Sequence, residues 1–225
     1  MAPPEVLEIG GWLVPLDNGS IGRAKSAVPL SHSLGPEAVD EIADAYRTRG
    51  LQPAFRLADL ADLDAVKAYL TQRGFVAQQP TIFKTGDVSD LAAVSILSAE
   101  ILTQPDDAWV ALFLGDGFDS VDGAHRVAAL TRSPDAIYAA AGEGGETRAV
   151  GVMTVGHGWA GIHGMRTAPA HRGKGLASAI LASLGRAAYA RGVSRVYLQV
   201  EEANPARSIY RRAGLSPIWR YHYWR

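Results

Sequence analysis

The sequence predicts an α/β protein, and two observations carry this prediction. Short strand-like runs alternate with helical patterns along most of the chain, and glycines close several of the helical patterns just before a strand-like run. Three further strand-like runs are separated only by Gly-rich turns and cover residues 137–141, 148–155 and 159–167.

The composition is that of an ordinary globular protein. The 225 residues are 48% apolar and 20% charged, and 22 Lys and Arg against 23 Asp and Glu give a net charge of -1. This balance provides no electrostatic argument for a nucleic acid or a membrane as partner. The first residues do not resemble a signal peptide and no apolar run has membrane-spanning length, so the expected location is the cytoplasm.

The chain contains no cysteine. This count excludes disulfides, cysteine-ligated zinc and a cysteine nucleophile, and with the nucleophile it excludes acyl transfer through a thioester on the enzyme. No metal site is expected.

The first half begins with an expected hairpin, in which strands at residues 11–14 and 23–28 are joined through Asp17-Asn18-Gly19. Apolar residues with helical spacing then predict two helices, and shorter runs predict two strands. These elements are expected, in order, as a helix from Pro36 to about Gly50 with Val39, Ile42, Ala43 and Tyr46 inward, a strand at 53–57, a helix ending at Gly74, and a strand around 81–83.

The second half follows a junction at Thr85 to Asp87 and begins with a helix near Leu91. Residues 105–126 show no clear pattern. After the three strands already named, the expected elements are a helix over about 175–191 with Ile180, Leu181, Leu184 and Ala188 on one face, a strand at 195–200, a helix at 204–213, and a last strand at 218–223.

The two halves also resemble each other weakly. The spacing from Gly50 to Gly74 is similar to that from Gly192 to Gly214, and each of these glycines closes a helical pattern. Duplication of one unit and the ordinary spacing of helix-ending glycines both account for this similarity.

The string HRGKGLASAIL, residues 171–181, follows a strand and begins a helix. Gly173 and Gly175 allow a sharp turn, and backbone amides at a helix N-terminus attract anions. A nucleotide P-loop is excluded because glycine, rather than Ser or Thr, follows Lys174, and a Rossmann fingerprint is excluded because Ser178 stands where its third glycine would be. A Gly-rich turn that binds nothing remains the alternative.

The pattern Arg172-x-x-Gly175-x-Ala177, preceded by Thr167-x-Pro169, resembles the pyrophosphate loop of the GNAT superfamily of N-acetyltransferases. A second motif of that family is matched further along by Asn204, by Tyr210 six residues later, and by Gly214-Leu215, while Leu198 and Val200 stand where the family's fifth strand carries apolar residues. The resemblance covers residues 88–225.

This resemblance implies a GNAT-type fold with a mixed sheet in the C-terminal half. The sequence after residue 28, PLSHSLGPE, lacks the loop glycines, so the first half resembles the smaller, degenerate N-terminal half of two-part GNAT proteins, packed against the active half. The expected domains are therefore residues 1–87, without a phosphate loop, and residues 88–225, which would be catalytic.

The activity implied by the resemblance is direct transfer of an acetyl group from acetyl-CoA, as co-substrate and without a metal, to a primary amine. The acceptor would be a small molecule or a protein amine, and the protein a monomer or homodimer. Backbone groups of 165–167 would bind the pantetheine arm, amides of 172–178 the pyrophosphate, and Asn204 the cofactor arm. The implied cofactor-binding residues are Met165, Arg166, Thr167, Arg172, Gly173, Lys174, Gly175, Leu176, Ala177, Ser178, Asn204, Arg207 and Tyr210.

Tyr210 is the candidate general acid. The departing CoA thiolate needs a proton, and a phenol with a pKa of about 10 stays protonated at neutral pH. A helix tyrosine packed into the core is the other interpretation. A non-catalytic acyl-CoA sensor or interaction module is the alternative function, which would keep the glycine loop but lose the acid.

Glu201, at the end of the predicted strand 195–200, is the candidate general base, with Glu202 and His163 behind it. Each of these side chains could instead have only a solvated surface role. Arg211 and Arg212, with Arg172 and Lys174, could add positive charge around the CoA phosphates, or could do nothing specific.

The last seven residues are unusually aromatic. Strand alternation would place Trp219, Tyr221 and Tyr223 on one face, where they would wall the acceptor site and stack on an amine, or would instead seal the core as a final strand.

Overall fold

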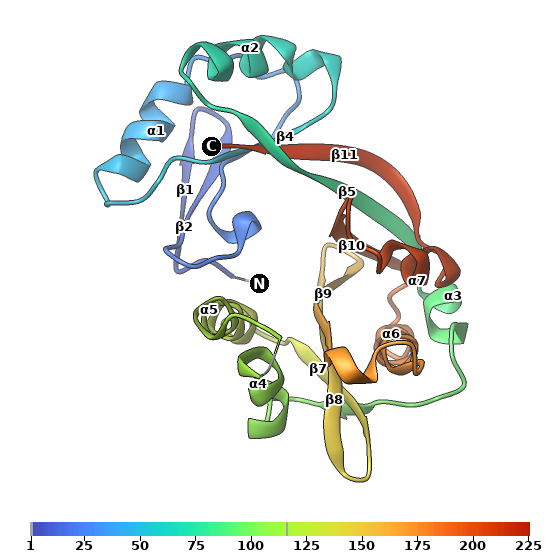
Figure 1. Ribbon diagram of the computed structural model, residues 1–225. Helices are drawn as coiled ribbons and strands as arrows, with labels where there is room; N and C mark the ends of the chain where they lie inside the picture. Colours follow the sequence, from blue (N-terminus) through green and yellow to red (C-terminus); the bar gives the residue numbers. More distant parts are fainter. Residues whose placement is uncertain (1, 116) are drawn as a thin grey trace. The chain divides into compact units, whose positions relative to one another are not determined.

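The computed structural model describes residues 2–115 and 117–225, which form two compact units (Figure 1). One unit comprises residues 83–218, and the other comprises residues 2–82 and 219–225. The chain passes from one unit to the other within two strands, β5 (Ala77–Asp87) and β11 (Ser216–Trp224). The expected junction at Thr85 to Asp87 therefore lies inside a strand, while the division into domains at residues 87 and 88 stays a prediction.

The unit of residues 83–218 contains a mixed sheet with the strand order β11-β5-β10-β9-β8-β7-β6. Neighbouring strands from β6 to β9 are antiparallel, whereas β9 and β10 are parallel, as the predicted mixed sheet requires. Its elements besides β5 and β11 are α3 (Val88–Ala93), β6 (Glu100–Leu102), α4 (Asp107–Leu114), α5 (Ser120–Thr131), β7 (Ile137–Glu143), β8 (Glu146–Gly156), β9 (Trp159–Thr167), the 3-10 turn η3 (Pro169–His171), α6 (Leu176–Tyr189), β10 (Arg195–Glu201) and α7 (Arg207–Arg212).

Helix α6 anchors the core of this unit. The four residues expected on its inner face, Ile180, Leu181, Leu184 and Ala188, are all fully buried, so the helical period in the sequence located this face correctly. They belong to one apolar cluster with residues of β9 and β10. Burying a side chain such as leucine stabilises the fold by about 1.5–3 kcal/mol, so this packing holds the start of α6 firmly against the sheet.

The stretch 105–126, which shows no clear pattern in the sequence, forms most of helices α4 and α5. Each helix is capped by an aspartate: Asp106 accepts a hydrogen bond from the Trp109 amide at 2.7 Å, and Asp119 accepts one from the Asp122 amide at 2.7 Å. Trp109 is fully buried and packs 4.7 Å, between ring centres, from Phe113. This stretch therefore has its own small apolar cluster against the sheet.

The other unit begins with a hairpin of β1 (Glu5–Ile9) and β2 (Trp12–Leu16), which was not expected from the sequence. The expected antiparallel pairing across Asp17-Asn18-Gly19 is present only in part: β2 pairs with β3 (Val28–Pro29) at Leu13 and Val28, but residues 22–24 form a 3-10 turn instead of a strand. The turn between β1 and β2 is Gly10-Gly11, whose φ angles of +53° and +81° suit the two-residue turn that connects paired strands. Asp17-Asn18-Gly19 instead closes on itself, because the Gly19 amide donates to the Asp17 carboxylate at 2.5 Å.

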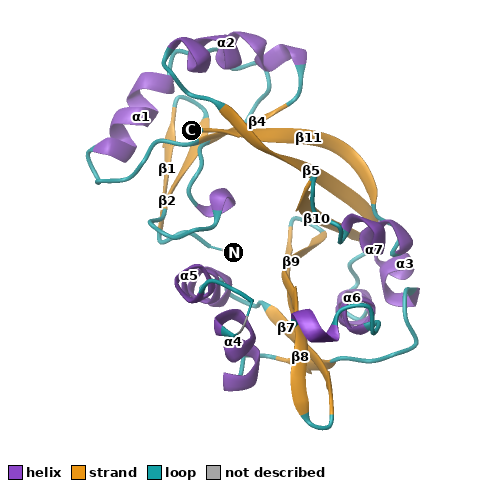
Figure 2. Ribbon diagram, in the orientation of Figure 1, coloured by secondary structure: helices purple, strands orange, loops and turns teal. Residues whose placement is uncertain are grey.

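The rest of this unit matches the sequence more closely. Its further elements are the 3-10 turn η1 (Gly22–Ala24), β3 (Val28–Pro29), α1 (Val39–Arg47), β4 (Phe55–Ala58), the 3-10 turn η2 (Ala61–Leu63) and α2 (Asp64–Gln72). All four residues predicted to face inward on α1 are buried. Strand β4 pairs antiparallel with the end of β11, and Figure 2 shows the strands and helices of this unit.

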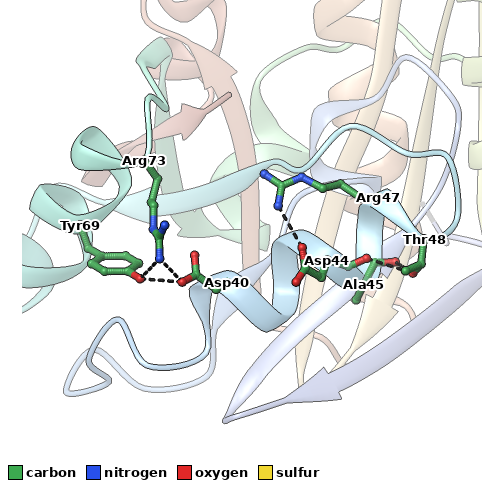
Figure 3. Close-up of polar contacts among 7 residues, drawn as sticks. All are labelled: Asp40, Asp44, Ala45, Arg47, Thr48, Tyr69 and Arg73. Atoms are coloured by element: carbon green, nitrogen blue, oxygen red, sulfur yellow. Dashed lines mark hydrogen bonds and ion pairs between the residues drawn. The ribbon is translucent and has the colours of Figure 1, made fainter.

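A polar cluster joins α1 to the end of α2 (Figure 3). The Tyr69 hydroxyl donates to the Asp40 carboxylate at 2.7 Å, and the Arg73 guanidinium donates to the same carboxylate and, at 2.6 Å, to the Tyr69 oxygen. The hydrogen bond to Tyr69 raises the pKa of Arg73. Because the arginine is exposed, this cluster orients the two helices more than it stabilises them.

Among the described residues, no helix combines the length and the apolar character needed to cross a membrane.

Candidate functional site

A groove of about 750 Å³ lies within the unit of residues 83–218, where β9 and β10 end and α6 and α7 begin. It is lined by Phe118, Met165, Arg166, Thr167, His171, Arg172, Gly173, Gly175, Leu176, Ala177, Ser178, Glu201, Ala203, Asn204, Pro205, Ala206, Ile209, Tyr210 and Arg212. Segments more than 40 residues apart in sequence therefore meet around one space.

Most residues singled out from the sequence line this groove. Of the residues implied to bind the cofactor, Lys174 and Arg207 do not line it, and neither does Arg211. The Lys174 ammonium lies 3.7 Å from the carboxylate of Glu143, and the Arg207 guanidinium donates to the backbone oxygen of Glu202 at 2.6 Å.

The loop before α6 presents backbone amides to the groove. Gly175 is the N-cap of the helix, with a left-handed φ of +81° that an L side chain rarely adopts. The amides of the first turn, from Leu176 to Ser178, have no acceptor within their own helix, and the helix dipole adds partial positive charge there. No acidic residue lies in this turn. The loop is thus suited to a phosphate group.

A split between β9 and β10 forms the wall next to this loop. The parallel pairing of the two strands ends at Ile162 with Leu198, although both strands continue beyond it. On its other edge β9 has a bulge opposite Gly151, and its residues 166 and 167 pair with β8. The backbone of residues 165–167 is extended, and its edge facing β10 lies beyond the last residue pair of β9 and β10. A chain-like ligand can pair with this edge as an added strand.

Tyr210 and Asn204 line the groove as well. Tyr210 is on α7 with 8% of its surface exposed, and it both lines the groove and belongs to the apolar cluster. Tyr210 therefore packs in the core and also lines the groove. The side-chain oxygen of Asn204 accepts from the Ala206 amide at 2.9 Å, which leaves its NH₂ group as the donor for a ligand.

Only one of the three candidate bases lines the groove. Glu201 is exposed at the end of β10 and lines the groove, whereas Glu202 and His163 do not. His163 is buried on β9, 3.3 Å from the Thr154 hydroxyl, with its ring 6.0 Å from the Tyr197 ring.

Several groove residues were not singled out from the sequence, and Phe118 and His171 are the two with aromatic side chains. Phe118 comes from the stretch without a clear pattern, so no signal pointed to it. His171 stands next to the glycine loop, and its Nδ1 atom is buried without a hydrogen-bond partner among the residues that the structure describes. A buried polar atom of this kind in a ligand groove suggests a group that bonds once the groove is filled.

The side chain of Arg166 turns toward α4 and α5. Its guanidinium lies 4.0 Å from the Phe118 ring centre and 4.7 Å from that of Phe113, and it donates to the Phe113 backbone oxygen at 3.2 Å. Burial, and then Arg126, lower the pKa of Arg166, while Asp122, 3.4 Å away, opposes the shift. Arg166 thus ties the Phe118 segment to β9 and brings positive charge to the groove.

Within residues 2–115 and 117–225, no group of three or more His, Asp or Glu side chains is arranged to hold a metal ion.

A family model described as "Probable histone acetyltransferase Rv0428c C-terminal" matches residues 4–224. The chain belongs to this family. It is 28% identical over 212 residues to "Probable histone acetyltransferase Rv0428c" of Mycobacterium tuberculosis, covering 86% of this chain and 60% of that protein. It is also 37% identical over 76 residues to "Uncharacterized N-acetyltransferase YobR" of Bacillus subtilis, covering 33% of this chain and 31% of that protein. This member of the family thus spans less than two thirds of either relative.

The fold of this family member is the GNAT fold. A GCN5-related N-acetyltransferase from Kribbella flavida superposes with a TM-score of 0.72 at 16% identity, covering 99% of this chain and 89% of that one. The match extends beyond residues 88–225, where the sequence motifs lie, and the predicted mixed α/β fold is confirmed.

Proposed function

We propose that this protein is an acetyltransferase that moves the acetyl group of acetyl-CoA directly to a primary amine. The observation that carries the proposal is the meeting, in one groove, of the glycine loop before α6, the edge of β9 beyond its last pair with β10, and a buried tyrosine. Membership in an acetyltransferase family supports it. When bound, acetyl-CoA would supply an activated acetyl thioester.

The residues present suit such a ligand. The amides of residues 172–178 would hold the pyrophosphate, with Arg172, His171 and Arg212 as side-chain donors on the same groove. The open edge of β9 at residues 165–167 would pair with the amide groups of the pantetheine arm, and Asn204 would donate to a carbonyl of that arm. One backbone amide of this edge would polarise the thioester carbonyl.

Tyr210 would act as the general acid. It lines the groove, with 8% of its surface exposed. Phenols in general are protonated at neutral pH. Tyr210 would donate its proton to the sulfur as the thiolate leaves. Because the chain has no cysteine, transfer would be direct, without a cysteinyl intermediate.

Glu201 would take the proton of the attacking amine, directly or through water. It is the one of the three candidate bases that lines the groove, and its exposure on β10 gives it a path to solvent.

The proposal also covers the acceptor, the domains, the location and the oligomeric state. The acceptor is a small-molecule amine or a protein amine, and the word "histone" in the printed name of the family makes a lysine-bearing protein the first acceptor to test. Residues 1–87 and 88–225 would be the two domains, in a cytoplasmic monomer or homodimer.

Calorimetry with acetyl-CoA, followed by a thiol-release assay with a panel of amines and a histone peptide, tests the proposal. We expect saturable binding and amine-dependent release of CoA thiol. Absence of binding would reject the cofactor assignment, and binding without release for any acceptor would favour a CoA sensor instead of an enzyme.

A further inference from the structure

The pair of strands formed by β4 and the end of β11 has two unlike faces. Phe55 and Trp224 lie opposite each other and pack into the apolar cluster of their unit. One residue further along each strand, Arg56 lies opposite Tyr223, so these two side chains share the other face with Tyr221. That second face carries the charge of Arg56 and the hydroxyl groups of the two tyrosines, with Ala58 opposite Tyr221.

We infer that Ser26 lies on this second face as well, from the direction of its neighbour Ala27. Ala27 bridges to Phe55 in parallel and points into the same apolar cluster, and the Arg56 amide donates to the Ala27 oxygen at 2.8 Å. Alternation along the chain therefore directs Ser26 to the side of Arg56. We call Ser26, Arg56, Tyr221 and Tyr223 the polar face.

The two tyrosine rings of the polar face each have an arginine of the protein over them. The Arg56 guanidinium lies 5.6 Å from the ring centre of Tyr221, and that of Arg225 lies 4.8 Å from the ring centre of Tyr223. The two tyrosine rings meet edge to face at 5.5 Å, and both tyrosines are 4% exposed. A ligand amine would meet like charge here, so these rings do not suit the cation stacking that their sequence suggests.

Two polar atoms of this face lack a partner. Ser26 is fully buried, and its hydroxyl oxygen has no hydrogen-bond partner anywhere in residues 2–115 or 117–225. The Nε atom of Arg56 is buried and equally unbonded within that part of the chain. Leaving a buried donor unsatisfied costs about 1–3 kcal/mol, so such atoms call for a ligand or ordered water.

A further cation lies near the same face. Burial and then the charge of Arg225 lower the pKa of Lys25, one residue before Ser26, and Asp17 partly opposes the shift. Arg56 and Arg225, each over one of the tyrosine rings, bring positive charge to the polar face itself, and a carboxylate or phosphate oxygen is the acceptor that suits such donors best.

We propose that the polar face is a binding site for an anionic group of a small ligand, a carboxylate or a phosphate, with Arg56 and Ser26 as its donors. The tyrosine rings hold the Arg56 guanidinium in place. The inference rests on one unit alone and does not depend on acetyl transfer.

Calorimetry of the full chain at constant ionic strength, with inorganic phosphate and separately with succinate over a chloride background, tests this site. We expect saturable binding of at least one of them, and the tighter anion identifies the group. R56Q should weaken that binding by about tenfold, the loss of one charged hydrogen bond. R220Q is the matched control, because Arg220 alternates to the other face of β11 and bonds to Asp59 at 2.5 Å, and it should bind within about twofold of wild type.

S26A separates ligand binding from a structural role. Removing an unsatisfied buried hydroxyl should leave the melting temperature of the free protein unchanged or raise it, yet weaken anion binding. This variant also decides the question if R56Q does not fold. Failure of both anions to bind above chloride would overturn the proposal, as would S26A binding the anion as wild type does.

Discussion

Replacing Gly175 by alanine tests whether the loop before α6 is an anion site. The residue has a φ of +81°, and a Cβ there would lie 3.5 Å from Leu97, an ordinary contact, so backbone strain is the main cost. For an L residue that strain is about 1–2 kcal/mol. In a protein of this size each kcal/mol lowers the melting temperature by about 2–4 °C, so a fall of about 2–8 °C is expected.

Gly192 provides the control at the other end of the same helix. It has a φ of +72° with no atom near its Cβ position, so Gly192→Ala should cost a similar amount of stability. Only Gly175→Ala would displace amides that face the groove. Loss of one hydrogen bond to a charged phosphate, about 1.5–3 kcal/mol, weakens acetyl-CoA binding by about 10- to 100-fold.

Calorimetry with acetyl-CoA, after thermal melts of both variants, measures the difference. Equal affinity of the two variants for acetyl-CoA, whether both are unchanged or both are weakened, would refute the anion-site reasoning.

Three further predictions concern single side chains. Tyr210→Phe should lower the rate of acetyl transfer by about 100-fold or more while acetyl-CoA affinity in calorimetry stays near wild type. The control Tyr189→Phe, at a residue 69% exposed on α6, should change neither. Full turnover by Tyr210→Phe would reject Tyr210 as the general acid. Glu201→Gln should lower the rate of acetyl transfer while acetyl-CoA affinity in calorimetry stays near wild type, and an unmoved pH-rate profile would eliminate Glu201 as the base. Burial of Asp59 would raise its pKa, but hydrogen bonds from Arg220 and His222 outweigh burial and lower it. The contribution of Asp59 to stability is therefore present above about pH 4 and is lost as the pH falls further. Between pH 7 and pH 3 the melting temperature of Asp59→Asn should fall less than that of wild type, and equal falls would contradict this assignment.

Helices α1 and α6 were the elements best predicted from the sequence. On α1 and α6 the apolar residues repeat with the helical period, and every residue predicted to face inward is buried. On α1 the period is visible because one side of the helix is buried and the other is exposed, whereas α6 is buried on every side from Ala179 to Gly185. Helices α4 and α5 escaped prediction because their apolar residues are less regularly spaced, although the aspartates that cap them were present as signals.

The first hairpin shows where local patterns mislead. Asp17-Asn18-Gly19 and Gly10-Gly11 are both turn signals, and the sequence does not rank them. In the structure β2 pairs with β1 through Gly10-Gly11 and also with β3, which follows Asp17-Asn18-Gly19 and the 3-10 turn η1. Only the first connection is a tight hairpin turn.

The sequence by itself determined the glycine loop, the Asn204 and Tyr210 motif, and with them the family, because these depend on residue identity at short spacing. Only the tertiary structure decided that the loop, the end of β9 and α7 share one groove, that Phe118 lines it, and that Lys174 and Arg207 do not. It also revealed the unsatisfied atoms of Ser26 and Arg56. The physical reason is that burial and hydrogen bonding are properties of neighbours, and the neighbours of these atoms come from distant parts of the chain.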